Sequence, residues 1–220
     1  MTTVYTRHVG TKFNSDGSPR YFPGNTVISR IEPDTPLFMA LTQAQNEFKK
    51  LACSKKYAFL PSSSFHMTVI EGLCDQVRQP EHWSKEIPLD APISKTNEFM
   101  ANRFSRLSFS DSIKMNIFNG GAPDVLMLRL ASVNAESENS IRRYRDTFSD
   151  IMGIRSPGHD DYQFHISLGY NIIELDETER SLIQNTYSLI LNTITNSIAP
   201  FFISAPQLTY FEGMCEFNNI

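Results

Sequence analysis

Two five-residue segments of this chain repeat one pattern of side-chain types, and each contains a histidine. Residues 65–69 read Phe-His-Met-Thr-Val and residues 164–168 read Phe-His-Ile-Ser-Leu, so that His165 follows His66 by 99 positions. Successive side chains of a β-strand point to opposite faces, so each histidine shares a face with the hydroxyl residue two positions later. We therefore expect two strands, each with one apolar face for the core and one face that carries a histidine and a hydroxyl.

Two histidines and two hydroxyls that converge on one groove could catalyse phosphoester chemistry. An imidazole has an unperturbed pKa near 6.5, so one histidine can accept a proton from the nucleophile while the other donates one to the leaving oxygen. Thr68 and Ser167 would donate hydrogen bonds to the non-bridging phosphate oxygens. We expect His66 and His165 to be the general acid and base, with no metal or other cofactor, and either histidine could take either role.

The paired motifs resemble those of the two-histidine (2H) phosphoesterase superfamily. That superfamily includes RNA 2′,5′-ligase-like proteins, 2′,3′-cyclic nucleotide phosphodiesterases and the enzyme that opens ADP-ribose cyclic phosphate. Residues 21–27 and 153–165 also resemble a branch of it found in microbes and fungi, and the likeness spans about residues 20–212. Serine in place of threonine in the second motif and methionine at position 67 are departures that remove no functional group.

The resemblance implies an α+β fold with two duplicated lobes, whose antiparallel sheets face a central cleft and whose helices cover the outer faces. Each lobe would give one motif strand to the cleft, where His66, Thr68, His165 and Ser167 match the catalytic tetrad of the family. It also implies a metal-independent phosphodiesterase that opens a 2′,3′-cyclic phosphate, or a related cyclic or 2′,5′ phosphate, on a nucleotide or RNA end. Ligation, the reverse reaction, would use the same groups.

Three other interpretations fit the same residues. His159, Asp160 and Asp161 beside His165 could bind a divalent ion, although the spacing fixes no fourth ligand. A groove that binds nucleotide phosphates or RNA ends without turnover would be a binding module. In the third interpretation the two segments are coincidental strands of a structural domain, and a wide separation of the histidines would favour it.

Three further side chains are candidates for contacts with the substrate. Arg129 interrupts an apolar strand, where a charge needs a partner or a substrate. Tyr21, with its neighbour Phe22, could stack on a base. Tyr170 follows the second motif histidine by five residues, an odd offset that turns it away from the groove unless a bulge, which Gly169 would permit, re-aims it.

The elements that position these residues follow from hydrophobic periodicity and from turn residues. Strands alternating with helices, and one hairpin around residues 119–121, favour an α+β domain over a doubly wound sheet. Residues 1–25 are expected to be extended or looped and to pack on a single domain that spans 26–220. Arg142, Arg143 and Arg145 have the spacing of a solvated helix face. The expected strands are 26–31, 65–70, 112–118, 124–130, 162–170, 201–203 and 207–211, and the expected helices are 34–51, 134–152 and 176–196.

The composition is that of one folded domain. The 220 residues are 40% hydrophobic and 20% charged, near the average of globular proteins, with a formal net charge of −4. This charge argues against a protein that coats long nucleic acid, and it leaves a nucleotide or RNA-end phosphate as the expected partner. Three cysteines without CxxC spacing suggest neither a disulfide framework nor a zinc site, and the first residues lack the apolar region of a secretory signal. We expect a soluble, cytoplasmic monomer that does not associate with membranes.

Overall fold

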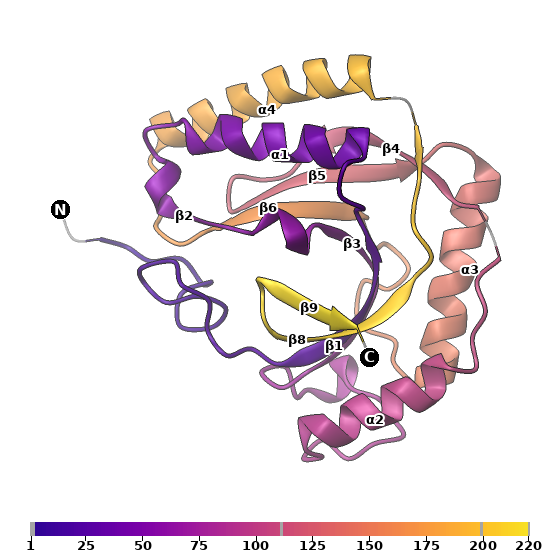
Figure 1. Ribbon diagram of the computed structural model, residues 1–220. Helices are drawn as coiled ribbons and strands as arrows, with labels where there is room; N and C mark the ends of the chain where they lie inside the picture. The colour runs from indigo at the N-terminus through magenta and orange to yellow at the C-terminus, as the bar shows by residue number, and fades with distance from the viewer. Residues whose placement is uncertain (1–2, 111, 199, 220) are drawn as a thin grey trace.

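The computed structural model of the protein describes residues 3–110, 112–198 and 200–219. Over these residues, four α-helices pack on a nine-stranded sheet with the strand order β7-β4-β5-β6-β3-β1-β8-β9, in which β2 also pairs with β6. All strand pairings within these ranges are antiparallel. The sheet is curled, and the helices lie on its outer side (Figure 1). None of the described helices combines the length and the apolar run that crossing a membrane requires.

One half of the sheet, the first lobe, is covered by two helices that run side by side across its outer face (Figure 1). Thr35 begins the first of them by accepting a hydrogen bond from the backbone N–H of Phe38. Asp176 and Glu179 form a capping box at the start of the second. The lobe consists of β7 (Phe201–Phe202), β4 (Lys114–Gly120), β5 (Val125–Ser132), β6 (His165–Asn171), β2 (Tyr57–Phe59), α1 (Pro36–Lys49) and α4 (Glu177–Ser197).

The other half, the second lobe, has its own pair of helices. Asn134 caps the longer of them by accepting a hydrogen bond from the backbone N–H of Ser137. That helix ends at Gly153, whose φ of 64° lies in the left-handed region that favours glycine. The lobe consists of β3 (His66–Cys74), β1 (Gly24–Arg30), β8 (Gln207–Gly213), β9 (Glu216–Asn219), α2 (Ile93–Phe104) and α3 (Ala135–Met152). Short 3-10 turns lie at Ser54–Lys56, Ser62–Ser64 and Pro80–His82.

The two lobes meet where the two motif strands pair. β3 of the second lobe pairs with β6 of the first, and Met67 and Ile166 are the partners that join them. Both side chains are fully buried in the main hydrophobic core, which lies between the sheet and the helices. The structure therefore confirms the predicted α+β fold with two lobes, each of which contributes one motif strand.

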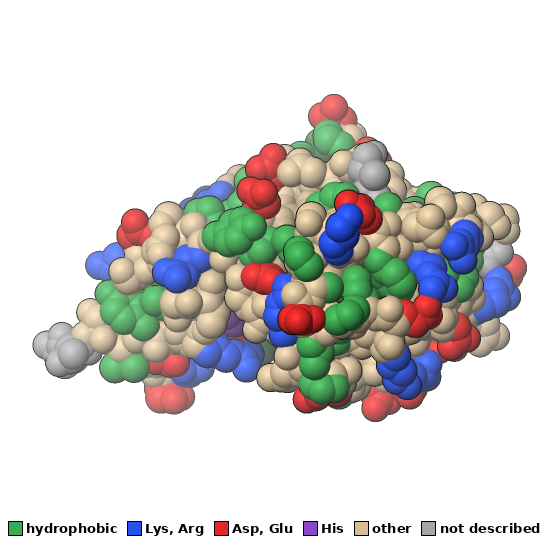
Figure 2. Space-filling view, turned by 90° about the horizontal axis from the view of Figure 1, so that it is seen from below, with side chains coloured by type: hydrophobic (Ala, Val, Ile, Leu, Met, Phe, Trp, Pro, Cys, Tyr) green, Lys and Arg blue, Asp and Glu red, His purple; other side chains and the backbone are tan. Residues whose placement is uncertain are grey.

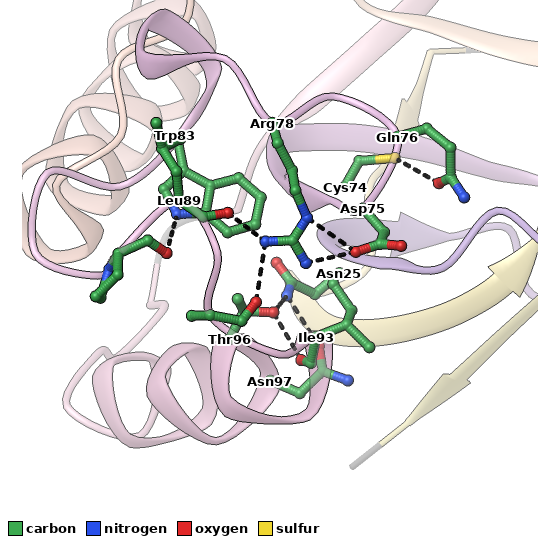
Figure 3. Close-up of polar contacts among 12 residues, drawn as sticks. Asn25, Cys74, Asp75, Gln76, Arg78, Trp83, Leu89, Ile93, Thr96 and Asn97 are labelled. Atoms are coloured by element: carbon green, nitrogen blue, oxygen red, sulfur yellow. Dashed lines mark hydrogen bonds and ion pairs between the residues drawn. The ribbon is translucent and has the colours of Figure 1, made fainter.

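The segment between β3 and α2, where sequence signals were weak, is held by the contacts of one arginine rather than by periodic packing (Figure 3). The Arg78 guanidinium donates to the Asp75 carboxylate at 3.0 Å and to the Ala91 carbonyl at 2.9 Å. It also lies 4.7 Å from the ring centre of Trp83. These contacts follow no helical or strand period, so they leave no repeating pattern in the sequence. The next helix, α2, was not predicted.

Asn25 of β1 links α2, as Figure 3 shows, to the motif strand β3. Its side-chain oxygen accepts from the backbone N–H of Leu73 at 2.8 Å, and its amide donates to Asn97 of α2 at 2.9 Å. β1 and β3 approach closely here, because a Cβ atom on Gly72 would collide with the Asn25 carbonyl oxygen. Only glycine fits at this position without moving one of the strands.

Residues 3–23, which we call the N-terminal strap, cross from one lobe to the other. At its start, the Thr6 backbone N–H donates to the Ile172 carbonyl, directly after β6, at 3.1 Å. At its end, the Phe22 N–H donates to the Glu212 carbonyl of β8 at 2.8 Å. Residues 1 and 2 of the segment expected to pack on the domain lie outside the described residues. A second, smaller apolar cluster joins the strap to both lobes, and it consists of Phe13, Phe22, Ala58, Leu60, Ile172, Phe211 and Met214.

Candidate functional site

The motif residues of both lobes line one pocket with a volume of about 400 Å³. His66 and Thr68 are half-buried in β3, as are His165 and Ser167 in β6, whereas the residues between them are fully buried on the other face. Because β3 and β6 pair antiparallel at Met67 and Ile166, a local twofold axis relates the two motifs. Figure 2 shows a histidine side chain in a recess of the surface, with Lys or Arg side chains beside it. The shared pocket contradicts the interpretation of the motifs as coincidental, unrelated strands.

The two imidazoles are held in the same way. Nδ1 of His66 lies 2.7 Å from the Ser64 carbonyl oxygen, and Nδ1 of His165 lies 2.9 Å from the Gln163 carbonyl oxygen. A carbonyl can only accept, so each Nδ1 carries a proton and donates it. Each Nε2 is therefore the atom that can gain or lose a proton, which is the arrangement that a general acid or base requires.

The surroundings lower the pKa of both histidines, but not by the same contributions. Burial, with smaller contributions from the charges of His165 and Arg30, lowers the pKa of His66 to about 4. Burial also lowers the pKa of His165, and there the carboxylate of Glu71 opposes the shift while Arg129 adds to it. Each histidine therefore has a guanidinium near it, and the difference between them is the carboxylate of Glu71, which acts on His165.

We expect the low pKa of His66 to make the fold sensitive to acid. The unfolded chain, with a histidine pKa near 6.5, takes up a proton before the folded one does, so stability is lost as pH falls from about 6.5 towards 4. At pH 5 this costs about 2 kcal/mol. Urea unfolding at pH 7 and pH 5 should show that His66→Gln loses less stability than the wild type. An equal loss in both proteins would contradict the low pKa.

A β-bulge in β6 aims Tyr170 into the pocket. In the pairing of β6 with β5, the next residue of β6 to have a partner after Ser167 is Gly169, so Leu168 is the extra residue of the bulge. The extra residue shifts the alternation of side chains by one, so the odd offset of five puts Tyr170 on the face of His165. Tyr170 accordingly lines the pocket with the motif residues.

β3 contains a bulge at the equivalent position. In the pairing of β3 with β1, the next residue of β3 to have a partner after Thr68 is Ile70, so Val69 is the extra residue of the bulge. Glu71, five residues after the first motif histidine, is thereby turned into the pocket. Sequence analysis missed Glu71. The sequence separation between Glu71 and Tyr170 equals that between the two motif histidines, and this match could have identified Glu71.

A buried arginine supports the bulge in β3. Arg145 of α3 is only 1% exposed, and its guanidinium donates to the carbonyls of Val69 and His159. It also lies 4.2 Å from the ring centre of Tyr162, a pocket-lining residue that sequence analysis missed. The extra residue of a bulge is left outside the strand ladder, so Arg145 provides a donor for its carbonyl. The prediction of a solvated arginine face is therefore wrong for Arg145.

The strap and the last two strands complete the pocket. The ring of Phe217 in β9 lies 4.3 Å, centre to centre, from that of His66. Because β9 was not predicted, this contact could not be expected from the sequence. The lining residues from these segments are Lys12, Phe22, Phe211, Met214 and Phe217.

Two of the predicted substrate contacts lie outside the lining of this pocket, as far as the described residues define it. Tyr21 is 64% exposed, and its neighbour Phe22 lines the pocket instead. Arg129 pairs with His165 in the register of β5 and β6, and its charge lowers the pKa of that histidine. The structure thus brings together the four motif residues and Tyr170, places Arg129 opposite His165 but outside the pocket lining, and leaves Tyr21 exposed.

The potential metal ligands form a group elsewhere. Asp146, His159 and Asp160 offer ligand atoms within 4.8 Å of one another, and within the described ranges this is the single group of three such residues. None of them lines the pocket. Arg155 pairs with both carboxylates, at 3.3 Å from Asp146, so one of their two negative charges is already balanced by the chain itself. His159, Asp160 and Asp161 therefore do not form a metal site together with His165, as one interpretation of the sequence proposed.

Both the sequence and the fold of the chain resemble those of known proteins. A family model named 2H-phosphodiest, described as a domain of unknown function (DUF1868), matches residues 12–123. The crystal structure of the conserved protein of unknown function ATU0111 from Agrobacterium tumefaciens str. C58 is 27% identical, with a TM-score of 0.92, over 99% of this chain and 92% of that one. The search of the curated proteins found no match.

Two further solved structures resemble the chain less closely. TT0787 of Thermus thermophilus is 14% identical, with a TM-score of 0.44, over 84% of this chain and 86% of that one. Usb1 of Kluyveromyces marxianus is 11% identical, with a TM-score of 0.41, over 91% of this chain and 99% of that one.

Proposed function

We propose, since this chain belongs to the 2H phosphodiesterase family, that it opens a cyclic phosphate on a nucleotide or RNA end by general acid–base catalysis. The substrate would carry a 2′,3′-cyclic phosphate, or a related cyclic or 2′,5′ phosphodiester. The observation that carries the proposal is the pair of histidines in one pocket, each with Nδ1 bound to a carbonyl and Nε2 left to exchange a proton. The pocket volume of about 400 Å³ suits a ligand of nucleotide size.

In this mechanism the phosphorus lies between the two imidazoles. One histidine takes a proton from water as the water oxygen forms a bond to phosphorus, and the other gives a proton to the ribose oxygen as its bond to phosphorus breaks. Thr68 and Ser167 donate hydrogen bonds to the non-bridging oxygens, whose charge grows in the transition state. The reaction ends with the protonation states of the histidines exchanged, and solvent restores them.

The charges around the pair support different roles for the two histidines. His66 has the lower pKa, reached through burial, so it is ready to accept a proton and would be the base. Glu71 favours the protonated form of His165, which would be the acid. We propose this assignment for the direction of hydrolysis, and the roles exchange for ligation.

The experiment that tests the proposed function incubates the pure protein, with EDTA present, with a panel of substrates. The panel contains 2′,3′-cyclic mononucleotides, ADP-ribose cyclic phosphate, 2′,5′-linked oligonucleotides and cyclic dinucleotides. We expect opening of at least one of them, undiminished by EDTA and absent in the double variant His66→Ala/His165→Ala. Loss of activity with EDTA and rescue by a divalent ion would indicate metal catalysis, and tight nucleotide binding without product would indicate a binding module.

A further inference from the structure

The N-terminal strap places Lys12 in the lining of the pocket, and its ammonium has no carboxylate partner among the residues that the structure describes. Lys12 lines the pocket and is half-buried. Its Nζ lies 4.8 Å from the ring centre of Tyr170 and 5.7 Å from that of Phe22. Within the described residues no carboxylate lies at ion-pair distance from it. A half-buried ammonium without a counter-ion is a site for an anion that arrives with a ligand.

The backbone that carries Lys12 is fixed rather than loose. Its N–H donates to the His8 carbonyl at 3.1 Å, and its own carbonyl accepts from the Arg20 N–H at 2.9 Å. The next side chain, Phe13, is fully buried in the cluster that joins the strap to both lobes. The backbone is therefore fixed and the ammonium rests on two aromatic rings before a ligand binds, which reduces the entropy lost on binding.

The position of Lys12 differs from that of the phosphate between the histidines. Lys12 sits over Tyr170, which lies three residues beyond Ser167 along β6. Because of the bulge at Leu168, the step from Ser167 to Tyr170 spans only two residues of the partner strand β5, so Tyr170 is roughly 7 Å along the strand from the hydroxyl that would bind the scissile phosphate. This separation is comparable with the length of one nucleoside. The charge of Lys12 also reaches the catalytic pair, because it lowers the pKa of His165.

We propose that Lys12 binds a second phosphate of the substrate, so that the protein prefers nucleotides that carry a further phosphate at the other end of the nucleoside. This inference rests on the proposed function and specifies its substrate class. An RNA end that carries a cyclic phosphate meets the requirement, as does a nucleoside 2′,3′-cyclic phosphate with a 5′-phosphate. A nucleoside 2′,3′-cyclic phosphate without a 5′-phosphate does not meet it.

The test compares kcat/KM for adenosine 2′,3′-cyclic phosphate with and without a 5′-phosphate. We expect the wild type to prefer the 5′-phosphorylated substrate by about tenfold, the scale of one charge-assisted hydrogen bond. Lys12→Met should lose most of this preference, and Lys12→Arg should keep part of it because the charge remains. Lys114→Met is the matched control, since Lys114 also lies over an aromatic ring, at 5.5 Å from Phe202, but outside the pocket.

Binding measured on the same variants separates this inference from the proposed function. Calorimetry with adenosine 3′-phosphate and adenosine 3′,5′-bisphosphate needs no turnover, and we expect the ratio of the two Kd values to fall from about 10 towards 1 in Lys12→Met. If the ratio of Kd values depends on Lys12 but no substrate is turned over, the proposed phosphodiesterase activity is refuted and the second phosphate site is supported. If the wild type turns over both substrates and Lys12→Met lowers kcat/KM equally for both, the phosphodiesterase activity is supported and the second phosphate site is refuted.

Discussion

Alanine at His66 or at His165 should lower the turnover of a cyclic phosphate by about 10²-fold or more, the usual scale for the loss of a general acid or base. Each histidine has an Nε2 free to move a proton in the same pocket, and no other histidine is held in this way beside the motif hydroxyls within the described residues. The double variant should be little worse than either single one, because the two groups act in one step. Near-normal turnover in either variant, with an unchanged near-UV circular dichroism spectrum, would refute the mechanism.

A substrate with a better leaving group should separate the two roles. A p-nitrophenyl phosphodiester releases a phenolate that needs no proton, so loss of the general acid should matter less for it than for a ribose ester. If His165 is the acid, as the carboxylate of Glu71 suggests, His165→Ala should retain more activity on this substrate than His66→Ala. The opposite order would exchange the two assignments.

The motif strands and most helices could be predicted because their signals are local. The alternation of side chains around His66 and His165 defines two strands by period alone. Cap residues such as Asn134 and Asp176 mark helix starts within one turn. The convergence of both strands on one pocket was implied by the family resemblance rather than by these periods.

The residues that sequence analysis missed depend on contacts between distant parts of the chain. A bulge changes the face of every later residue in a strand, and the residues next to Glu71 contain no local pattern that predicts the bulge in β3. Lys12 reaches the pocket because the strap crosses both lobes, whereas its own neighbourhood is only rich in turn residues. Arg145 looks like part of a polar helix face, and its partners are carbonyls of other segments.

The second large effect should be on stability. Arg145→Met removes the donor from the carbonyls of Val69 and His159 while keeping an unbranched side chain of similar reach. Each carbonyl left buried without a donor costs about 1 to 3 kcal/mol, and contact with the ring of Tyr162 is also weakened. We expect the free energy of unfolding, measured with urea at pH 7, to fall by about 3 kcal/mol.

An exposed arginine provides the comparison for Arg145. The exposed side chain of Arg106 donates to Asn102 and, within the described residues, makes no other hydrogen bond, so Arg106→Met should change stability by no more than about 0.5 kcal/mol. If Arg145 also holds the bulge, turnover of Arg145→Met should fall under conditions where the variant is fully folded, because Glu71 and Tyr162 lose their support. A variant as stable and as active as the wild type would mean that the bulge in β3 keeps its shape without the guanidinium.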